Sequence, residues 1–293
     1  VNGWSHLSFT QPWVLVLPLV AAAALVAGAF WLNARRDFGA GVVPQKPGPS
    51  GGDVVLPWRV HRTSVIGWTV AFTLAGGAMG AVAAGMHGSL DTAAPAMQEF
   101  LRRYGSGEIG DVFLWMVLVS LGSVASLFPM LAVLRIRVDE VEGRAELLLA
   151  TAYSRMRWAS GHLVVASAGT LAMMTAAGLA AGRGGARVLS AALIQVPAAW
   201  VVGAAAMVLV GFVPRAAAAA SWVVWLAVTM FGEIVGPSLG IDYGIADLVS
   251  PFHHLPRVLS GEQLTAAPLL GLAAVAALLT SVGVARLRVR DLG

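Results

Sequence analysis

The chain contains 293 residues, of which 58% are hydrophobic and 12% are charged, and its formal net charge at pH 7 is +4. Soluble domains carry about twice this charged fraction, so the composition excludes a soluble enzyme and indicates a membrane protein. Because cysteine is absent, disulfide frameworks, thiolate metal sites and cysteine nucleophiles are excluded as well.

Seven stretches are long and apolar enough to cross the roughly 30 Å hydrocarbon core of a bilayer as helices. In chain order they are Pro12–Ala34, Thr63–Met86, Val112–Leu134, Leu163–Gly182, Val188–Pro214, Ala216–Ile241 and Gln263–Ala285. All but the sixth lack charged residues, and the sixth contains one acid, Glu233. We therefore predict an all-α fold, a polytopic transmembrane bundle of about seven helices.

The distribution of basic residues predicts the orientation of the bundle, because cytoplasmic loops carry an excess of Lys and Arg. Alternate loops, at about 35–62, 135–161 and 214–215, together with the C-terminal tail, hold most of the 19 Lys and Arg residues. We expect these loops to be cytoplasmic, with the N-terminus outside and the C-terminus inside. Abundant Arg, Ala and Gly are typical of a GC-rich bacterial genome, so the bacterial cell membrane is the expected location.

Three regions are predicted along the chain. Residues 1–34 form an outer N-terminal segment and the first span, 35–62 form a cytoplasmic linker, and 63–293 form a six-span half-domain. The linker contains the Pro- and Gly-rich stretch 44–52, which is typical of an extended, flexible segment. The outer loop 236–262 contains three prolines and is expected to hold a short interfacial or re-entrant piece.

The segment 135–158, between the third and fourth predicted spans, is charged and amphipathic. Its apolar residues recur at helical spacing and are expected to form one side of a helix; they are Val138, Val141, Ala145, Leu148 and Leu149. Glu140 and Arg144, four residues apart, are expected to pair on another side. Such a helix would lie along the membrane surface. It would either offer its charged side to a partner protein or act as an ordinary juxtamembrane helix that anchors in anionic lipid.

Residues 142–155 read Glu-Gly-Arg-Ala-Glu-Leu-Leu-Leu-Ala-Thr-Ala-Tyr-Ser-Arg. This segment resembles the Glu-Gly-x-x-Glu-x-Leu-Leu-x-x-Pro-x-Ser-Arg segment of type two ATP-binding-cassette exporter permeases. Within that class the chain is most similar to the second half of the actinobacterial exporters of polyketide antibiotics, the tetronasin-type permeases. Further matching elements are Arg35-Arg36-Asp37-Phe38-Gly39-Ala40-Gly41, Pro47-Gly48-Pro49, Ser250-Pro251-Phe252 and Arg288-Val289-Arg290-Asp291-Leu292. The resemblance covers nearly the whole chain.

Two features depart from the family pattern. Ala152 stands where the pattern usually has proline, so a looser turn is expected after the surface helix. Family members of the tetronasin type usually have about twelve spans, whereas seven are predicted here. We therefore expect a fragment of a longer permease or a split subunit. The first apolar stretch is expected to be a true span, because it lacks a basic leader and is too long for a signal peptide.

The resemblance implies the role of the surface segment, because in this family a surface helix couples the permease to its ATPase. A coupling helix is expected at about 139–150. The residues expected to contact the ATPase or brace the helix are Asp139, Glu140, Glu142, Gly143, Arg144 and Glu146. No cofactor is expected in this chain; ATP and Mg²⁺ are expected in the ATPase subunit, present in two copies. Another permease half or copy, membrane lipid and a hydrophobic small-molecule substrate are the other expected partners, and nucleic acid is not expected.

Polar residues inside the spans are candidates for contacts with a substrate or for gating. Glu233 is the acid within a span, and burying an ionisable group there is costly. Gln195 is a second candidate, for which hydrogen bonding between helices is the alternative role. His162, at the inner start of the fourth span, is expected to be a polar interfacial residue. Gly76 and Gly80 have the spacing that permits close helix approach, although chance matches are common in glycine-rich helices.

Catalytic motifs are absent from the sequence. There is no Gly-x-x-x-x-Gly-Lys-Ser/Thr phosphate loop, so ATP hydrolysis is expected in a partner subunit. There is also no His-Glu-x-x-His or Gly-x-Ser-x-Gly motif, which disfavours a membrane enzyme. The expected function is that of a permease subunit of an ATP-binding-cassette exporter for hydrophobic or amphiphilic antibiotics, drugs or lipids. The alternatives are a gradient-driven secondary transporter or channel and a non-transporting scaffold subunit.

Overall fold

The computed structural model describes residues 55–86, 109–150, 154–182, 185–230 and 249–290, together with a few residues between positions 20 and 31. The chain divides into two compact units, Val1–Ser50 and Gly51–Gly293. The described residues of the first unit are helical and lie within the predicted first span. No strand occurs among the described residues of either unit, which confirms the predicted all-α class.

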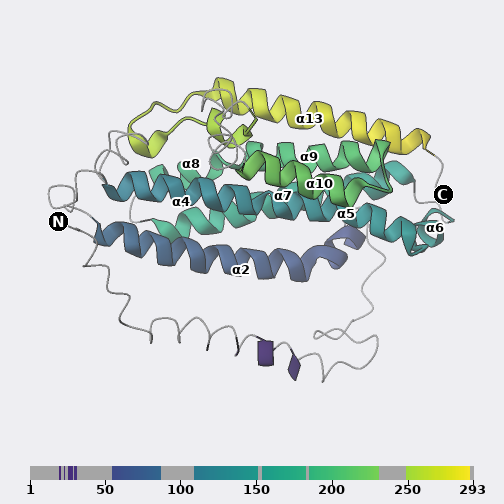
Figure 1. Ribbon diagram of the computed structural model, residues 1–293, viewed down its shortest axis with the longest axis horizontal. Coiled ribbons are helices and arrows are strands. Elements are labelled where there is room, and N and C mark those ends of the chain that lie inside the picture. Colours follow the sequence, from purple (N-terminus) through teal and green to yellow (C-terminus); the bar gives the residue numbers. More distant parts are fainter. Residues whose placement is uncertain are drawn as a thin grey trace, which may run out of the picture. The chain divides into compact units, whose positions relative to one another are not determined.

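The described part of the second unit contains five helical segments long and apolar enough to cross a membrane (Figure 1). They are α2 (Val55–Gly85), α4 (Ile109–Ala125) continued by α5 (Leu127–Val141), α7 (Arg155–Ala181), α8 (Ala186–Leu193) continued by α9 (Val196–Phe212), and α13 (Ala266–Val289). A shorter apolar helix, α10 (Ala217–Met230), forms the first part of the sixth predicted span. The rest of that span, including Glu233, lies outside the described residues.

Helix α2 begins earlier than the composition suggested. It starts at Val55, within the stretch predicted as a linker, whereas the apolar pattern predicted a start at Thr63. The added turns contain Arg59, which is exposed, and Arg62, which is half-buried. A span predicted from uncharged sequence stops at these arginines. The helix itself continues through them, because their long side chains can reach water.

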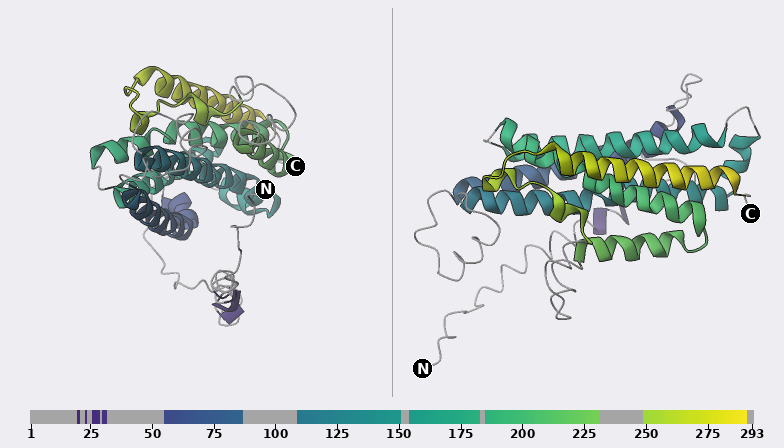
Figure 2. Two further views of the ribbon diagram at one scale, coloured as in Figure 1. Left: turned by 60° about the vertical axis from the view of Figure 1, so that its left-hand side comes forward. Right: turned by 90° about the horizontal axis from the view of Figure 1, so that it is seen from above.

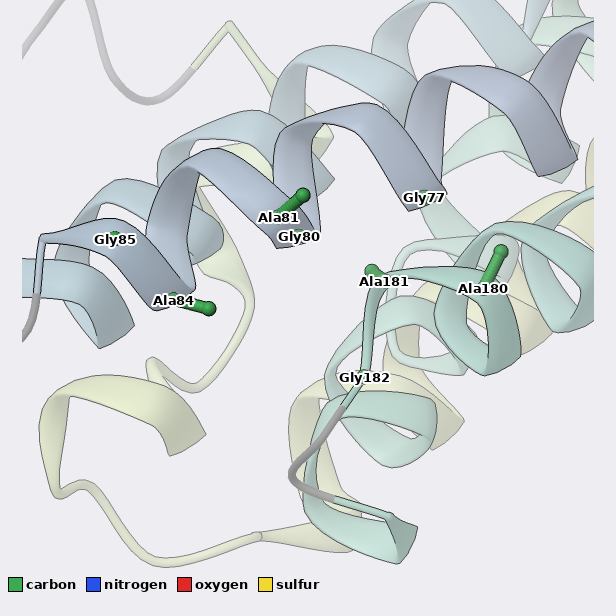
Figure 3. Close-up of a pocket in the computed structure, with 8 residues that line it drawn as sticks. All are labelled: Gly77, Gly80, Ala81, Ala84, Gly85, Ala180, Ala181 and Gly182. Carbon is green, nitrogen blue, oxygen red and sulfur yellow. The ribbon is translucent and has the colours of Figure 1, made fainter.

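The helices of the second unit run side by side along a common direction (Figures 1 and 2). Helix α2 packs along α7, and α13 packs along α9. The Gly-x-x-x-Gly spacing in α2 does provide a close approach, because a Cβ built on Gly80 would lie 2.1 Å from the carbonyl oxygen of Ala181 in α7. Figure 3 shows Gly80 and Ala181 on these two helices, beside a cavity between their ends.

Two of the long helical segments are interrupted near the middle, and the interruptions lie against each other. Helix α4 gives way to α5 at Ser126, and α8 gives way to α9 at Gln195. A Cβ on Gly122 of α4 would lie 2.7 Å from Cβ of Gln195, so the two segments touch at this level. Trp225 of α10 donates through Nε1 to the Ser126 hydroxyl at 3.1 Å. The buried apolar residues form two clusters, one mainly from α2, α4, α7 and α8 and one mainly from α5 and α9.

Two short 3-10 helices cover the end of the bundle at which α4 and α13 begin. They are η3 (Pro251–His254) and η4 (Val258–Ser260), within the described part of the predicted outer loop. Phe252 and Leu259 are buried in the first cluster. Arg187 of α8 holds this cap, since it donates to the Leu259 carbonyl at 3.2 Å and forms an ion pair with Asp111 of α4 at 3.3 Å.

Candidate functional site

The segment predicted as one surface helix is a corner between two helices. Helix α5 continues from its membrane span to Val141, and the six-residue helix α6 (Arg144–Leu149) follows. Gly143, between them, has a φ of 70°, a left-handed conformation that ends helices and favours glycine. The prediction of a single helix over about 139–150 was therefore wrong in its extent. We refer to residues 139–146 as the corner.

Asp139 joins the two arms of the corner. Its side chain is 8% exposed and accepts a hydrogen bond from Arg144 Nε at 3.0 Å, and Arg144 Nη2 lies 2.9 Å from the same oxygen. Arg135, one turn earlier on α5, forms an ion pair with this carboxylate at 3.1 Å. The predicted pairing of Glu140 with Arg144 was wrong, because the break at Gly143 turns Arg144 towards Asp139 instead.

Glu140 is buried and links the corner to the C-terminal end of the last helix. Its side chain is 3% exposed, and its two oxygens lie 2.5 and 2.6 Å from Arg290 Nη2. Arg137 Nη1 donates to the same carboxylate at 3.1 Å. Arg155, at the start of α7, donates to the backbone carbonyl of Arg290 at 2.7 Å. Glu140 therefore braces the corner and is not available for contact with a partner.

The exposed part of the corner carries charge of both signs. Glu142 and Arg144 form an ion pair, and their side chains are 47% and 44% exposed. Glu146 on α6 is also exposed, and Val141, predicted to lie on the apolar side of the helix, is 67% exposed. The six residues predicted for this site thus divide by position: Asp139 and Glu140 brace it, Gly143 makes the turn, and Glu142, Arg144 and Glu146 face outward.

A pair of histidines behind the corner was missed by the sequence analysis. His61 Nε2 of α2 and His162 Nδ1 of α7 lie 2.9 Å apart and both residues are buried, so one ring donates a hydrogen bond to the other. The Trp158 ring lies edge-on to His162, with 6.0 Å between the ring centroids. His162, predicted to be a polar interfacial residue, is therefore buried in the protein and links two helices. Its partner is 101 residues away in the sequence, and no local spacing signals such a pair.

Gln195 is fully buried at the interruption between α8 and α9. Its amide nitrogen lies 3.5 Å from the Ala191 carbonyl of its own helical turn, and its Oε1 has no hydrogen-bond partner among the described residues. It lines neither of the two cavities described below. The structure therefore places Gln195 at a contact between helix interruptions, while Glu233 lies outside the described residues.

Two cavities between the helices are lined by residues that the structure describes. One, of about 510 Å³, lies between the ends of α2 and α7 and is lined by glycine and alanine (Figure 3). The other, of about 490 Å³, is called the α13 cavity here and is bounded by α5, α7, α9 and α13. Its lining residues are Pro129, Val133, Ser160, Leu163, Ala166, Ser167, Trp200, Gly203, Ala204, Ala273, Ala276, Ala277, Thr280, Ser281 and Val284. This lining is mostly apolar, includes hydroxyl groups and carries no charge.

Comparisons with known proteins match most of the chain. Residues 51–288 match the family described as "Multidrug efflux system permease Rv1217c, C-terminal domain". The chain is 36% identical over 299 residues to the multidrug efflux system permease protein Rv1217c of Mycobacterium tuberculosis (strain ATCC 25618 / H37Rv). That alignment covers 95% of this chain and 53% of the relative, so the chain spans about half the length of the curated protein it matches.

Proposed function

This chain belongs to the family of the multidrug efflux system permease Rv1217c, C-terminal domain, and on that premise we propose that it is one permease half of an exporter driven by a separate ATP-binding-cassette ATPase. The family and the apolar helices make it a multi-pass membrane protein of a transport family. The observation that carries the proposed coupling is the corner, a charged, braced turn at the end of a membrane-spanning helix.

The corner has the mechanical properties that coupling requires. A motor outside the membrane moves a bundle only through a stiff element that touches both. Helix α5 runs without interruption from Leu127 to Val141, and the ion pair between Asp139 and Arg144 fixes α6 to its end. Glu142, Arg144 and Glu146 then offer hydrogen-bonding charges to a partner surface. We assign the contact with the ATPase to these three residues.

The ion pairs of the corner support the proposed orientation. Together with a hydrogen bond from Arg155, they join basic residues from two parts of the chain: Arg135 and Arg155 from the 135–161 loop, and Arg290 from the C-terminal tail. These parts were predicted to be cytoplasmic because of their Lys and Arg content, and their gathering at one end of the bundle agrees with a single basic face. We propose that this face is cytoplasmic, where ATP and Mg²⁺ are available to the ATPase, and that the N-terminus lies outside.

The α13 cavity supports the proposed substrate class. An uncharged, mostly apolar lining with a few hydroxyl groups suits a hydrophobic or amphiphilic molecule better than an ionic solute. The relative is named a multidrug efflux permease, and the resemblance to tetronasin-type exporters adds polyketide antibiotics as compounds to test. Two ATPase copies and a second permease half complete the proposed assembly, in contact with membrane lipid.

The proposal is tested by removing both outward carboxylates of the corner. We expect Glu142→Ala combined with Glu146→Ala to reduce copurification of the ATPase and to lower drug efflux at least about fivefold, the lower range for coupling between linked sites. Glu262→Ala, an exposed acid near the opposite end of the bundle, is the control and should leave both unchanged. Full efflux with normal ATPase association in the double variant contradicts the assignment. Efflux that persists without any ATPase supports a gradient-driven transporter instead.

A further inference from the structure

Helix α13 is attached to the bundle mainly along one neighbour, α9, and the two backbones meet at Gly283. A Cβ on Gly283 would lie 2.6 Å from the Met207 carbonyl carbon, and one on Gly211 would lie 2.8 Å from the Gly283 carbonyl oxygen. The Arg286 guanidinium lies 5.7 Å from the centre of the Phe212 ring in the same region. Elsewhere much of α13 is exposed, since only 11% of the residues in its most apolar stretch are buried. The backbones of α13 and α9 therefore approach each other closely near Gly283.

Beyond this contact, the end of α13 is tied to the corner. Arg290 follows Gly283 by seven residues, about 10 Å along a helix. Its guanidinium pairs with the buried Glu140 of α5, and its carbonyl accepts a hydrogen bond from Arg155 of α7. We call these three residues the clamp. A carboxylate that is 3% exposed and shares two oxygens with one guanidinium holds its partner closely, because separation would leave a buried charge unpaired.

On the other side of the contact, α13 forms one wall of the α13 cavity. The residues of α13 in this wall are Ala273, Ala276, Ala277, Thr280, Ser281 and Val284, and all but Val284 precede Gly283 in the chain. The facing walls come from α5, α7 and α9. Helix α13 thus carries the clamp at its C-terminal end, a close backbone contact near Gly283, and a cavity wall that lies mostly N-terminal to that contact.

We propose that the clamp makes α13 a second moving element of the coupling site. A displacement of the corner carries Arg290 with it, rocks α13 about its contact with α9 and changes the width of the α13 cavity. This inference rests on the proposed function, because an ATPase supplies the displacement. Glu140, Arg155 and Arg290 are positioning residues: they touch neither ATPase nor substrate, and they transmit the motion of the corner to the cavity wall.

The experiment uses the absence of cysteine from the chain, which allows two introduced cysteines to carry spin labels. Leu278→Cys on α13 and Val164→Cys on α7 are suitable, because these side chains are 63% and 49% exposed on two helices that border the cavity. The distance between the labels is measured in the complex with its copurified ATPase, in lipid nanodiscs, with and without ATP and vanadate. We expect nucleotide trapping to change this distance by roughly 1–2 Å or more, as in helix shifts of other switching proteins.

A set of variants distinguishes loss of the clamp contacts from a general loss of protein stability. Arg290→Gln should abolish the change in distance and lower efflux at least about fivefold, while the ATPase still copurifies and hydrolyses ATP. Arg290→Lys should restore part of both, because it keeps the charge beside Glu140. Arg288→Gln is the matched control: it removes the same charge two residues away, on an exposed side chain, and should behave as the unmodified protein does. Arg155→Gln tests the second attachment without altering the ion pair, and it should weaken the change in distance.

Each outcome has a definite meaning. The inference is overturned if Arg290→Gln keeps the nucleotide-dependent change in distance, or if the unmodified complex transports drug while the distance stays constant. If Arg290→Gln yields too little folded complex, Arg155→Gln decides, and an unchanged distance response in that variant likewise contradicts the clamp. If no ATPase copurifies with the unmodified chain, the proposed function itself fails, and the clamp fails with it as a coupling device.

Discussion

Arg144 forms two ion pairs that differ in burial, and this difference sets their expected importance. Asp139 is 8% exposed and holds α6 against α5, whereas Glu142 is 47% exposed and pairs in contact with water. Hydrogen bonds to a buried charged group contribute about 1.5–3 kcal/mol, and exposed ion pairs contribute about 0–1 kcal/mol. The rigidity of the corner therefore depends on Asp139.

The two acidic partners can be compared with matched substitutions. Because Arg144 is itself partly exposed, we expect Asp139→Asn to lower the free energy of unfolding by about 1–2 kcal/mol and to reduce efflux. Glu142→Gln should lower it by less than about 0.5 kcal/mol. Thermal unfolding of the purified proteins in detergent measures the loss of unfolding free energy, and drug efflux from cells measures the loss of transport. Equal losses in both variants would show that burial does not set the importance of these pairs.

For individual residues, the sequence pattern located the charged segment but did not predict which of its charged side chains form ion pairs. Glu140, Arg144 and Gly143 are close in sequence, and a helical period predicts that the first two pair. The glycine between them breaks that period, and its left-handed backbone is a conformation that the spacing of apolar residues does not reveal. Glu140 instead pairs with Arg290, which is 150 residues away. Such a partner depends on how whole helices pack.

Among the elements, the contact between α2 and α7 depends on glycine. A Cβ at Gly80 would lie 2.1 Å from the Ala181 oxygen and 2.6 Å from its carbonyl carbon, which are backbone atoms that cannot rotate away. Gly67, on the same helix, has no atom within 4 Å of the corresponding position. Alanine changes the helical propensity equally at both positions. The difference in stability between the two variants therefore measures the packing contact at Gly80.

We expect Gly80→Ala to lower the free energy of unfolding by about 1–3 kcal/mol, as overpacking of a close contact does. Gly67→Ala should be neutral or stabilising by up to about 1 kcal/mol, since alanine restricts the unfolded chain. Thermal unfolding and the yield of monodisperse protein measure both. If Gly80→Ala is as stable as Gly67→Ala, the two helices are not in close contact at this position.

The sequence predicted that Gly76 and Gly80 permit close packing, and it left the partner helix open. Hydropathy located the apolar parts of α2, α7 and α13, because uncharged stretches of about 20 residues are typical of membrane spans; it missed the charged first turns of α2 and α7. It did not place the interruptions at Ser126 and Gln195, since apolar composition is continuous across both. Pro129 and Pro197 follow the interruptions closely and cannot donate a helical N–H, so they are the local signal for them. The contact between Gly122 and Gln195 shows that the two segments touch there.

At the scale of the whole molecule, the predicted orientation can be tested directly, because the chain has no cysteine of its own. Helix α6 and the start of α13 lie at opposite ends of the bundle (Figure 1). Val141 at the corner and Leu264 just before α13 are 67% and 58% exposed. An excess of basic residues marks the cytoplasmic side, and the corner gathers Arg135, Arg155 and Arg290.

We therefore expect Leu264→Cys to react with a membrane-impermeant maleimide in intact cells, and Val141→Cys to react after the membrane is permeabilised. Efflux activity of both variants is the control for native insertion. The reverse pattern would place the corner outside the cell, where an ATPase lacks its nucleotide, and the coupling role of Glu142, Arg144 and Glu146 would have to be abandoned together with the clamp. The predicted pattern would leave the corner as a braced, charged surface on the side where ATP is hydrolysed.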